Sequence, residues 1–210
     1  MDRPPARVLY LVVCAAPPAR KVGELVDLLQ HAGWAVCVIT TPTATAWVDT
    51  AQLRHHTGHP VRSQPRRPEE PDPLPPASAL VVAPATFNTI NKWACGVSDT
   101  FALGILNELL GLGVPILVSP YAKPALTSHP AFRRSLRMLR GSGAHVTAVE
   151  ALRPAGDVGP FRWSAVTEPL RRLVPTTGGA SGGAGGAGDV SEPAIPGPRS
   201  PDCSEHDPAT

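Results

Sequence analysis

The stretch RVLYLVVCAAPPARKVGELVDLLQHAGWAVCVIT, residues 7–40, decides the fold class because it contains a strand pattern, a helix pattern and a second strand pattern in succession. Residues 7–13 are an apolar, β-branched run typical of a buried strand. Residues 19–32 place apolar side chains at helical spacing, and Gly33 follows as a stop signal. Residues 34–40 form a second buried run. The stretch therefore predicts a β–α–β unit with parallel strands.

The alternation continues along the chain. Further buried strands are expected at residues 79–83, 114–118 and 145–149. Helices are expected at residues 43–53, 86–110 with a break near Gly96, 130–140 and 161–173. This order predicts an α/β fold in which a central parallel sheet lies between two helical layers, a three-layer sandwich.

Two segments lack this periodicity. Residues 57–76 contain seven prolines and predict a long loop. Residues 176–210 contain eight glycines and five prolines, so we expect a tail too poor in apolar groups to order. The predicted organisation is one domain over residues 1–175, with the Pro-rich loop at 57–76, followed by a disordered tail at 176–210.

Composition excludes several classes of protein. No apolar run approaches the roughly 18 residues that a membrane span needs. Net charge is +2 and aromatic residues make up 5%, so neither a concentrated basic face nor a stacking platform for nucleic acid is expected. The tail has a net charge of −4, which leaves the domain at +6 and suits an anionic ligand. We expect no nucleic-acid partner and no membrane partner.

Cysteine usage favours a reducing compartment. Cys14, Cys37 and Cys95 lie in apolar segments, and no spacing typical of a zinc site occurs, so buried reduced thiols, no metal site and a cytoplasmic location are expected. An alternative for the N-terminus is a short signal peptide, since arginines precede the apolar residues 8–16. Pro17 and Pro18 directly after this run favour the buried strand.

The carboxyl ends of the predicted strands are the expected place for a ligand, because parallel sheets bind ligands at that edge. Small residues follow the first strand and would let an anion approach backbone amides, although these residues alone favour a tight β–α turn. After the second strand, Thr40, Thr41 and Thr43 offer hydroxyls that would hold a phosphate or, in the case of Thr43, cap the next helix.

The third strand end is the richest in polar groups. Amides, hydroxyls and one ammonium follow the strand within a few residues and can form directed hydrogen bonds to a ligand: Thr86, Asn88, Thr89, Asn91 and Lys92. A structural turn needs a single cap and not this density of polar side chains. The segment therefore predicts a binding site.

The stretch APATFNTINKWACGVSDTFAL, residues 83–103, resembles the signature of the flavin-dependent cysteine decarboxylase superfamily. That superfamily includes phosphopantothenoylcysteine decarboxylases and the peptidyl-cysteine decarboxylases of lantibiotic biosynthesis. Residues 12–48 resemble its first β–α–β unit, and VPILVSPYAKPAL, residues 114–126, lies where the superfamily has its substrate clamp. The resemblance covers about residues 8–149. It implies a flavodoxin-like fold and a homo-oligomer, often a trimer, that binds FMN between subunits.

The resemblance also implies roles for individual residues. It places Cys14, Ala15 and Ala16 of the first turn against the FMN phosphate. Thr41 and Thr86 would contact the phosphate or the ribityl chain. Ala85, Thr89 and Ser98 would lie near the flavin. Asn88 matches the asparagine associated with the carboxylate of the substrate. Trp93 stands where the superfamily usually has a smaller residue, in the core or at a subunit interface.

The departures from the superfamily bear on catalysis. No histidine precedes the third strand within residues 70–78, and the Met and Asn of the clamp are replaced by Ala122 and Lys123. The superfamily oxidises a substrate thiol with its flavin, and the product then loses CO2. The absence of the histidine and of the clamp asparagine should remove substrate orientation and proton handling. Lys123 is expected either to pair with a carboxylate or phosphate or to be a solvated loop residue.

Three hypotheses follow. The first is an FMN-dependent enzyme of decarboxylase type that acts on a carboxylated small molecule or peptide. The second is a relative without catalytic activity that serves as a regulatory or assembly subunit. The third is a Rossmann-like nucleotide binder without flavin.

Overall fold

The computed structural model describes residues 7–67, 69–71, 74–154 and 159–175. Its helices and strands follow one another in this order: β1 (Arg7–Val13), η1 (Pro17–Lys21), α1 (Val22–His31), β2 (Trp34–Thr40), η2 (Thr43–Trp47), α2 (Thr50–Thr57), β3 (Ala79–Ala85), α3 (Phe87–Ala94), α4 (Phe101–Gly111), β4 (Ile116–Pro120), α5 (Pro124–Thr127), α6 (Pro130–Gly141), β5 (His145–Val146) and α7 (Ser164–Leu173). The predicted tail at 176–210 lies outside the described residues.

The sheet has five strands in the order β2-β1-β3-β4-β5, and every pair is parallel. β1 lies between two neighbours, with Leu9 opposite Val36 of β2 on one side and opposite Ala79 of β3 on the other. This strand order is the flavodoxin-like one, with its switch point between β1 and β3. The predicted central parallel sheet and the flavodoxin-like fold are therefore confirmed.

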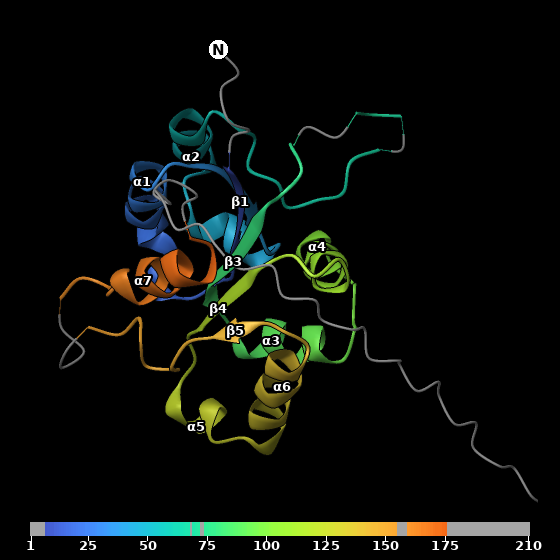
Figure 1. The fold of residues 1–210 in the computed structure, drawn as a ribbon, viewed down its shortest axis with the longest axis vertical. Coiled ribbons are helices and arrows are strands. Elements are labelled where there is room, and N and C mark those ends of the chain that lie inside the picture. The colour runs from blue at the N-terminus through green and yellow to red at the C-terminus, as the bar shows by residue number, and fades with distance from the viewer. Residues whose placement is uncertain (1–6, 68, 72–73, 155–158, 176–210) are drawn as a thin grey trace, which may run out of the picture. The chain divides into compact units, whose positions relative to one another are not determined.

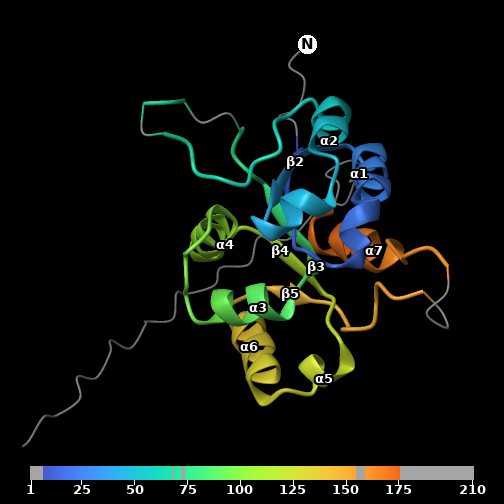
Figure 2. The ribbon, with the colours of Figure 1, turned by 180° about the vertical axis from the view of Figure 1, so that it is seen from behind.

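Helices cover both faces of the sheet (Figure 1), because successive side chains of each buried strand point to opposite sides. In β1, Val8, Tyr10 and Val12 belong to one core cluster, and Leu9, Leu11 and Val13 belong to the other. The first cluster includes apolar residues of α3, α4 and α6, and the second includes those of α1, α2 and α7. Figure 2 shows the same division from behind. The three-layer sandwich is confirmed.

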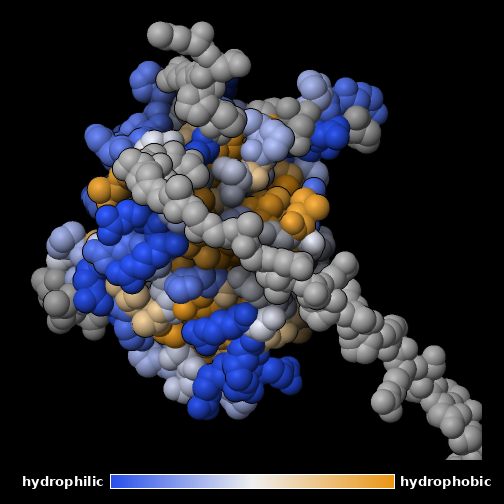
Figure 3. Space-filling view, viewed as in Figure 1, coloured by the Kyte–Doolittle hydropathy of each residue, from blue (hydrophilic) through white to orange (hydrophobic). Residues whose placement is uncertain are grey.

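The outer helices present hydrophilic faces to solvent, as Figure 3 shows over α6 and α7. α6 buries Phe132, Leu136 and Leu139 and leaves its arginines exposed. Within the described part of the chain, no helix has the length and apolar character needed to cross a bilayer.

Several element boundaries differ from the sequence predictions. The helix expected from residue 19 is preceded by a 3-10 turn, η1, which begins at Pro17 and includes residues 19–21. The helix expected at 43–53 is two elements, η2 and α2, and β5 has two residues where five were expected. β4 lies two residues further along than predicted, and α5 was not predicted.

The helix expected at 86–110 divides into α3 and α4, and Gly96 lies at the predicted break with φ of 70°. Only glycine adopts this conformation without strain. Trp93, for which the sequence left core or interface open, belongs to α3 and is buried in the core.

The described residues of the Pro-rich segment after α2 form a loop, as expected, but this loop is tied to the sheet. Leu74 is buried, the hydroxyl of Tyr10 donates to the carbonyl of Pro75 at 2.9 Å, and Arg62 forms a bridge with Ile39 at the edge of β2. The loop therefore contributes to the core cluster that includes α4.

Candidate functional site

A cavity of about 1010 Å³ lies at the carboxyl edge of the sheet. Residues that follow all five strands line it: Ala15, Ala16 and Pro17 after β1; Thr41, Pro42, Thr43 and Trp47 after β2; Thr86, Phe87, Asn88, Thr89 and Lys92 after β3; Tyr121, Ala122, Lys123 and Leu126 after β4; Arg153 after β5; and Thr100 and Leu103 at the start of α4. The cavity therefore includes the switch point between β1 and β3, where this class of sheet binds its ligands.

The turn after β1 contributes only small side chains to this wall. Ala15 and Ala16 line the cavity, and Pro17 begins η1 beside them. A methyl group is the largest side-chain group that these two alanines can place between a ligand and the backbone. The turn consequently allows a close approach to the main chain, as expected for a site that accepts an anion or a cofactor edge.

Cys14 lies behind this turn and not in the cavity wall. It is buried, and its thiol donates a hydrogen bond of 3.3 Å to Oγ1 of Thr89. Burial raises the pKa of the Cys14 thiol, and hydrogen bonds with Thr89 and Thr86 partly oppose this effect. A protonated, enclosed thiol is a packing group and a weak donor.

The beginning of α3 brings three predicted site residues together. Thr86 is the N-cap residue, but its side chain does not cap the helix; its Oγ1 lies 3.2 Å from Oγ1 of Thr89. Asn88 is exposed in the first turn, and Thr89 is buried at the cavity wall. The first amide groups of an α-helix have no partners within the helix and carry partial positive charge. This end of α3 therefore offers donors to an anion.

Thr41 also lines the cavity, but the helix cap expected of Thr43 is wrong. Thr43 is the first residue of η2, whose N-cap is Pro42, and α2 is capped instead by Asp49, which accepts from the amide of Gln52 at 2.9 Å. The neighbouring Thr40 is buried, and its hydroxyl lies 2.9 Å from that of Thr45. After β2, the hydroxyl groups in the cavity lining are therefore those of Thr41 and Thr43.

Besides Cys14, two further predicted site residues lie outside the lining. Ala85 is fully buried in β3, one residue before the wall begins. Ser98 is exposed between α3 and α4, and its Oγ accepts a hydrogen bond of 2.8 Å from Asn107. α4 is capped by Thr100, whose Oγ1 accepts a hydrogen bond from the amide of Leu103.

The cavity is lined by three cationic side chains and by no carboxylate among the described residues. Lys92 pairs with Asp99, and Arg153 pairs with Glu150. The two carboxylates lie outside the lining. Lys123 is exposed and forms no ion pair within the part of the chain that the structure describes. A wall with this sign of charge attracts anionic ligands.

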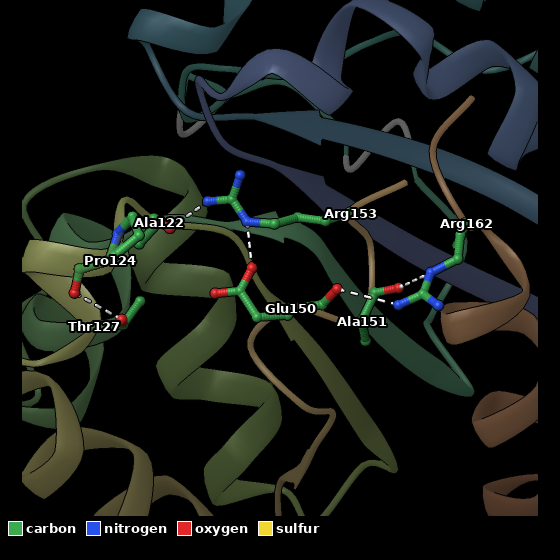
Figure 4. Close-up of polar contacts among 7 residues, drawn as sticks. All are labelled: Ala122, Pro124, Thr127, Glu150, Ala151, Arg153 and Arg162. Carbon is green, nitrogen blue, oxygen red and sulfur yellow. Dashed lines mark hydrogen bonds and ion pairs between the residues drawn. The ribbon is translucent and has the colours of Figure 1, made fainter. Parts of the chain in front are cut away.

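Arg153 is a charged residue of the lining that sequence reasoning missed, as it missed the apolar and aromatic Trp47, Leu103 and Tyr121. Figure 4 shows its guanidinium between the main chain at Ala122 and the side chain of Glu150. Nη2 donates to the carbonyl of Ala122 at 2.8 Å, and the guanidinium carbon lies 4.7 Å from the ring centre of Tyr121. The rule that ligands bind at the carboxyl edge would have found it, had the rule been applied also to the fifth strand.

The fold and the cavity define a flavodoxin-like α/β protein with a cationic site at the switch point of its sheet. The chain belongs to the Flavoprotein family, whose model matches residues 2–174. This confirms the resemblance found in the sequence.

Individual relatives agree with this assignment. The coenzyme A biosynthesis bifunctional protein CoaBC of Thermococcus kodakarensis is 26% identical over 172 residues, which cover 78% of this chain and 41% of that protein. The matched regions span less than half the length of the curated relatives.

Solved structures show the same fold. A PPC decarboxylase mutant complexed with pantothenoylaminoethenethiol has a TM-score of 0.65 and 19% identity, covering 80% of this chain and 98% of that one. The FMN-dependent cysteine decarboxylase SpaF has a TM-score of 0.63 and 23% identity, with coverage of 80% and 98%.

Proposed function

We propose that the cavity binds FMN and that the chain is a flavin-dependent enzyme of decarboxylase type acting on a carboxylated small molecule or peptide. The observation that carries this proposal is the convergence of Ala15, Thr41 and Thr86 with the start of α3 on one cavity. Membership of the Flavoprotein family and the likeness to FMN-dependent decarboxylases support it.

The residues present fit such a cofactor. The volume of about 1010 Å³ lies at the upper end of the range typical of ligand sites, roughly 300–1,000 Å³. The small turn after β1, the hydroxyls of Thr41 and Thr86 and the amides that begin α3 suit a phosphate and a ribityl chain. Apolar and aromatic groups of Trp47, Leu103 and Tyr121 provide walls for a flat ring.

Bound FMN would supply the two-electron oxidation of a substrate thiol, after which the substrate can lose its carboxylate as CO2. The protein then has to bind and orient the substrate. The exposed amide of Asn88 can donate to a substrate carboxylate, and the ammonium of Lys123 can approach the same ligand from the β4 side of the cavity. Fixing this anion would set the orientation of the thiol.

A second function, flavin binding without catalysis, is favoured by the residues at positions where the superfamily contacts its substrate. Ala122 and Lys123 stand in place of the clamp Met and Asn, and residues 70–78 contain no histidine. A regulatory or assembly subunit would tolerate both replacements, because only cofactor binding would need to persist.

We also propose a cytoplasmic homo-oligomer, a trimer or a multiple of one, on the basis of the family resemblance. Light scattering during size-exclusion chromatography of the full chain measures the oligomeric state directly. A monomer at every concentration tested would exclude it.

The test of the proposed function uses the purified full chain mixed with FMN and then freed of unbound cofactor. We expect one FMN per chain, measured by the visible absorbance of oxidised flavin. Anaerobic addition of thiols that carry a carboxylate, such as N-acetyl-L-cysteine, should then bleach this absorbance and release CO2.

The possible results separate the hypotheses. Failure to take up FMN, together with binding of ADP or NAD, would favour the nucleotide binder without flavin. Uptake of FMN with no bleaching by any thiol in a panel of cysteine derivatives would favour the inactive subunit.

A further inference from the structure

Arg153 and Glu150 lie together at the rim of the cavity, in the segment between β5 and α7 (Figure 4). Nε of Arg153 and Oε2 of Glu150 form an ion pair. Arg153 lines the cavity, whereas Glu150 does not. We propose that Arg153 is a binding subsite for the carboxylate of the ligand, and that Glu150 holds this subsite until the ligand displaces it.

The guanidinium of Arg153 is held in position by groups other than Glu150. Nη2 donates to the carbonyl of Ala122, and the ring of Tyr121 lies against the guanidinium carbon. The side chain is three-quarters buried, with 23% of its surface exposed. The guanidinium would therefore stay at the cavity wall after Glu150 moved away, as a binding residue must.

The carboxylate of Glu150 is the weakly held partner. Its side chain is 57% exposed, and it lies only three residues before Arg153 on an irregular segment. Exposed ion pairs contribute little to stability, because water and salt compensate their separation. A ligand carboxylate can accordingly replace it at small cost and accept the same charge-assisted hydrogen bond.

The chemistry of the two groups sets the class of ligand. A guanidinium recognises planar carboxylates through paired donors, and Glu150 is itself such a carboxylate. Lys123 adds a second cation one residue beyond Ala122. The inference rests on the proposed function and deepens it, since Arg153 would select ligands that carry a carboxylate over those that have lost it.

The experiment compares two probes that differ by one carboxylate, N-acetyl-L-serine and N-acetylethanolamine. A hydroxyl in place of the thiol prevents oxidation, so binding is measured without turnover. Dissociation constants are obtained by calorimetry on the FMN-loaded full chain, and FMN affinity is measured separately for every variant. The wild-type protein is expected to bind the serine derivative more tightly.

Arg153→Met and Glu150→Gln are expected to act in opposite directions. Arg153→Met should raise the dissociation constant of N-acetyl-L-serine by about tenfold or more and leave that of N-acetylethanolamine unchanged. Glu150→Gln should lower the constant for N-acetyl-L-serine by about two- to fivefold, because the internal competitor loses its charge. Glu150→Gln decides the question even if Arg153→Met fails to fold.

Arg162→Met is the matched control. Arg162 is exposed, lies outside the cavity lining, and donates to the backbone of the same segment, at the carbonyls of Ala151 (3.2 Å) and Glu150 (3.4 Å). Arg162→Met removes these hydrogen bonds to the segment between β5 and α7 but leaves Arg153 in place. It should therefore change the affinity for both probes by the same factor.

Absence of FMN binding in the wild-type protein would overturn the proposed function. With FMN bound, the subsite is overturned by equal or undetectable binding of the two probes, by equal effects of Arg153→Met and Arg162→Met, or by weaker binding of N-acetyl-L-serine in Glu150→Gln.

Discussion

The thiol of Cys14 donates to the hydroxyl oxygen of Thr89 at 3.3 Å and so joins the end of β1 to the first turn of α3. Oγ1 of Thr89 lies 3.2 Å from that of Thr86, so a chain of three polar side chains runs from the buried Cys14 to two residues of the cavity lining. Residues 75 positions apart in sequence thereby fix the relative position of the two turns at the switch point.

The first prediction concerns thiol reactivity. Burial raises the pKa of the Cys14 thiol, and it raises that of Cys37 to about 11, whereas Cys95 is exposed. Since the thiolate is the reactive form, iodoacetamide at about pH 8 should label Cys95 in the native protein and leave Cys14 and Cys37 unlabelled until the protein unfolds. Peptide mapping by mass spectrometry checks this. Labelling of Cys14 as fast as that of Cys95 would contradict the burial of Cys14.

The same pKa shifts predict how stability depends on pH. A thiol whose pKa is higher in the folded than in the unfolded state stabilises the protein fully below the unfolded value of about 9.0, and this contribution is lost as the pH rises towards about 11. The free energy of unfolding should therefore fall across this alkaline range. Urea titrations at several pH values measure the fall. It should be smaller in Cys37→Ala, and an identical slope in that variant would refute the assignment.

The fold was predictable from sequence because its strands are short, apolar runs separated by helical periodicity, as in residues 7–40. The boundaries of its helices and strands were less predictable. At η2, the amides of Ala44 and Thr45 donate to the carbonyl of Thr41. These main-chain hydrogen bonds cannot be predicted from a pattern of side chains. β5 pairs with β4 at two positions, His145 opposite Leu117 and Val146 opposite Val118, and the apolar pattern of residues 145–149 does not show where this pairing ends.

Much of the candidate site was also predictable, since the carboxyl edge of a parallel sheet brings distant turns together. Ala15, Thr86 and Lys123 line one cavity as a direct result of strand order. Residue identity alone does not say which neighbour faces outward. Ala85 is buried and Ser98 is turned to Asn107, and Arg153 reaches the cavity from an irregular segment without periodicity.

Ala15→Asp tests whether the turn after β1 faces the phosphate of FMN. A carboxylate at this wall position should repel the phosphate and raise the dissociation constant of FMN by about tenfold or more, with little change for riboflavin, which has no phosphate. Flavin fluorescence measures both constants. Ala15→Ser, which is neutral and also small, is the control. An equal loss of affinity for FMN and riboflavin in the Asp variant would point to a steric effect elsewhere.

Asn88 is predicted to act on the substrate and not on the cofactor. Asn88→Ala should keep the affinity for FMN and lower kcat/KM about tenfold or more, because a hydrogen bond to a carboxylate is lost. Asn88→Asp should lower it further, since a carboxylate there repels that of the substrate. Steady-state kinetics with the best thiol substrate provides the measurement. Unchanged kcat/KM in both variants would remove Asn88 from the substrate site.

Lys123 distinguishes a ligand-binding lysine from a solvated one. Its side chain lines the cavity and makes no capping hydrogen bond to α5, so Lys123→Gln should leave stability unchanged. If the ammonium attracts a carboxylate, KM should rise about two- to fivefold at low salt, and the dependence of KM on salt should become shallower. Arg137→Gln removes the same charge from the exposed face of α6, outside the cavity, and should alter neither quantity. A salt dependence that is equal in the wild-type protein and Lys123→Gln would mean that the ammonium remains in solvent while the substrate binds.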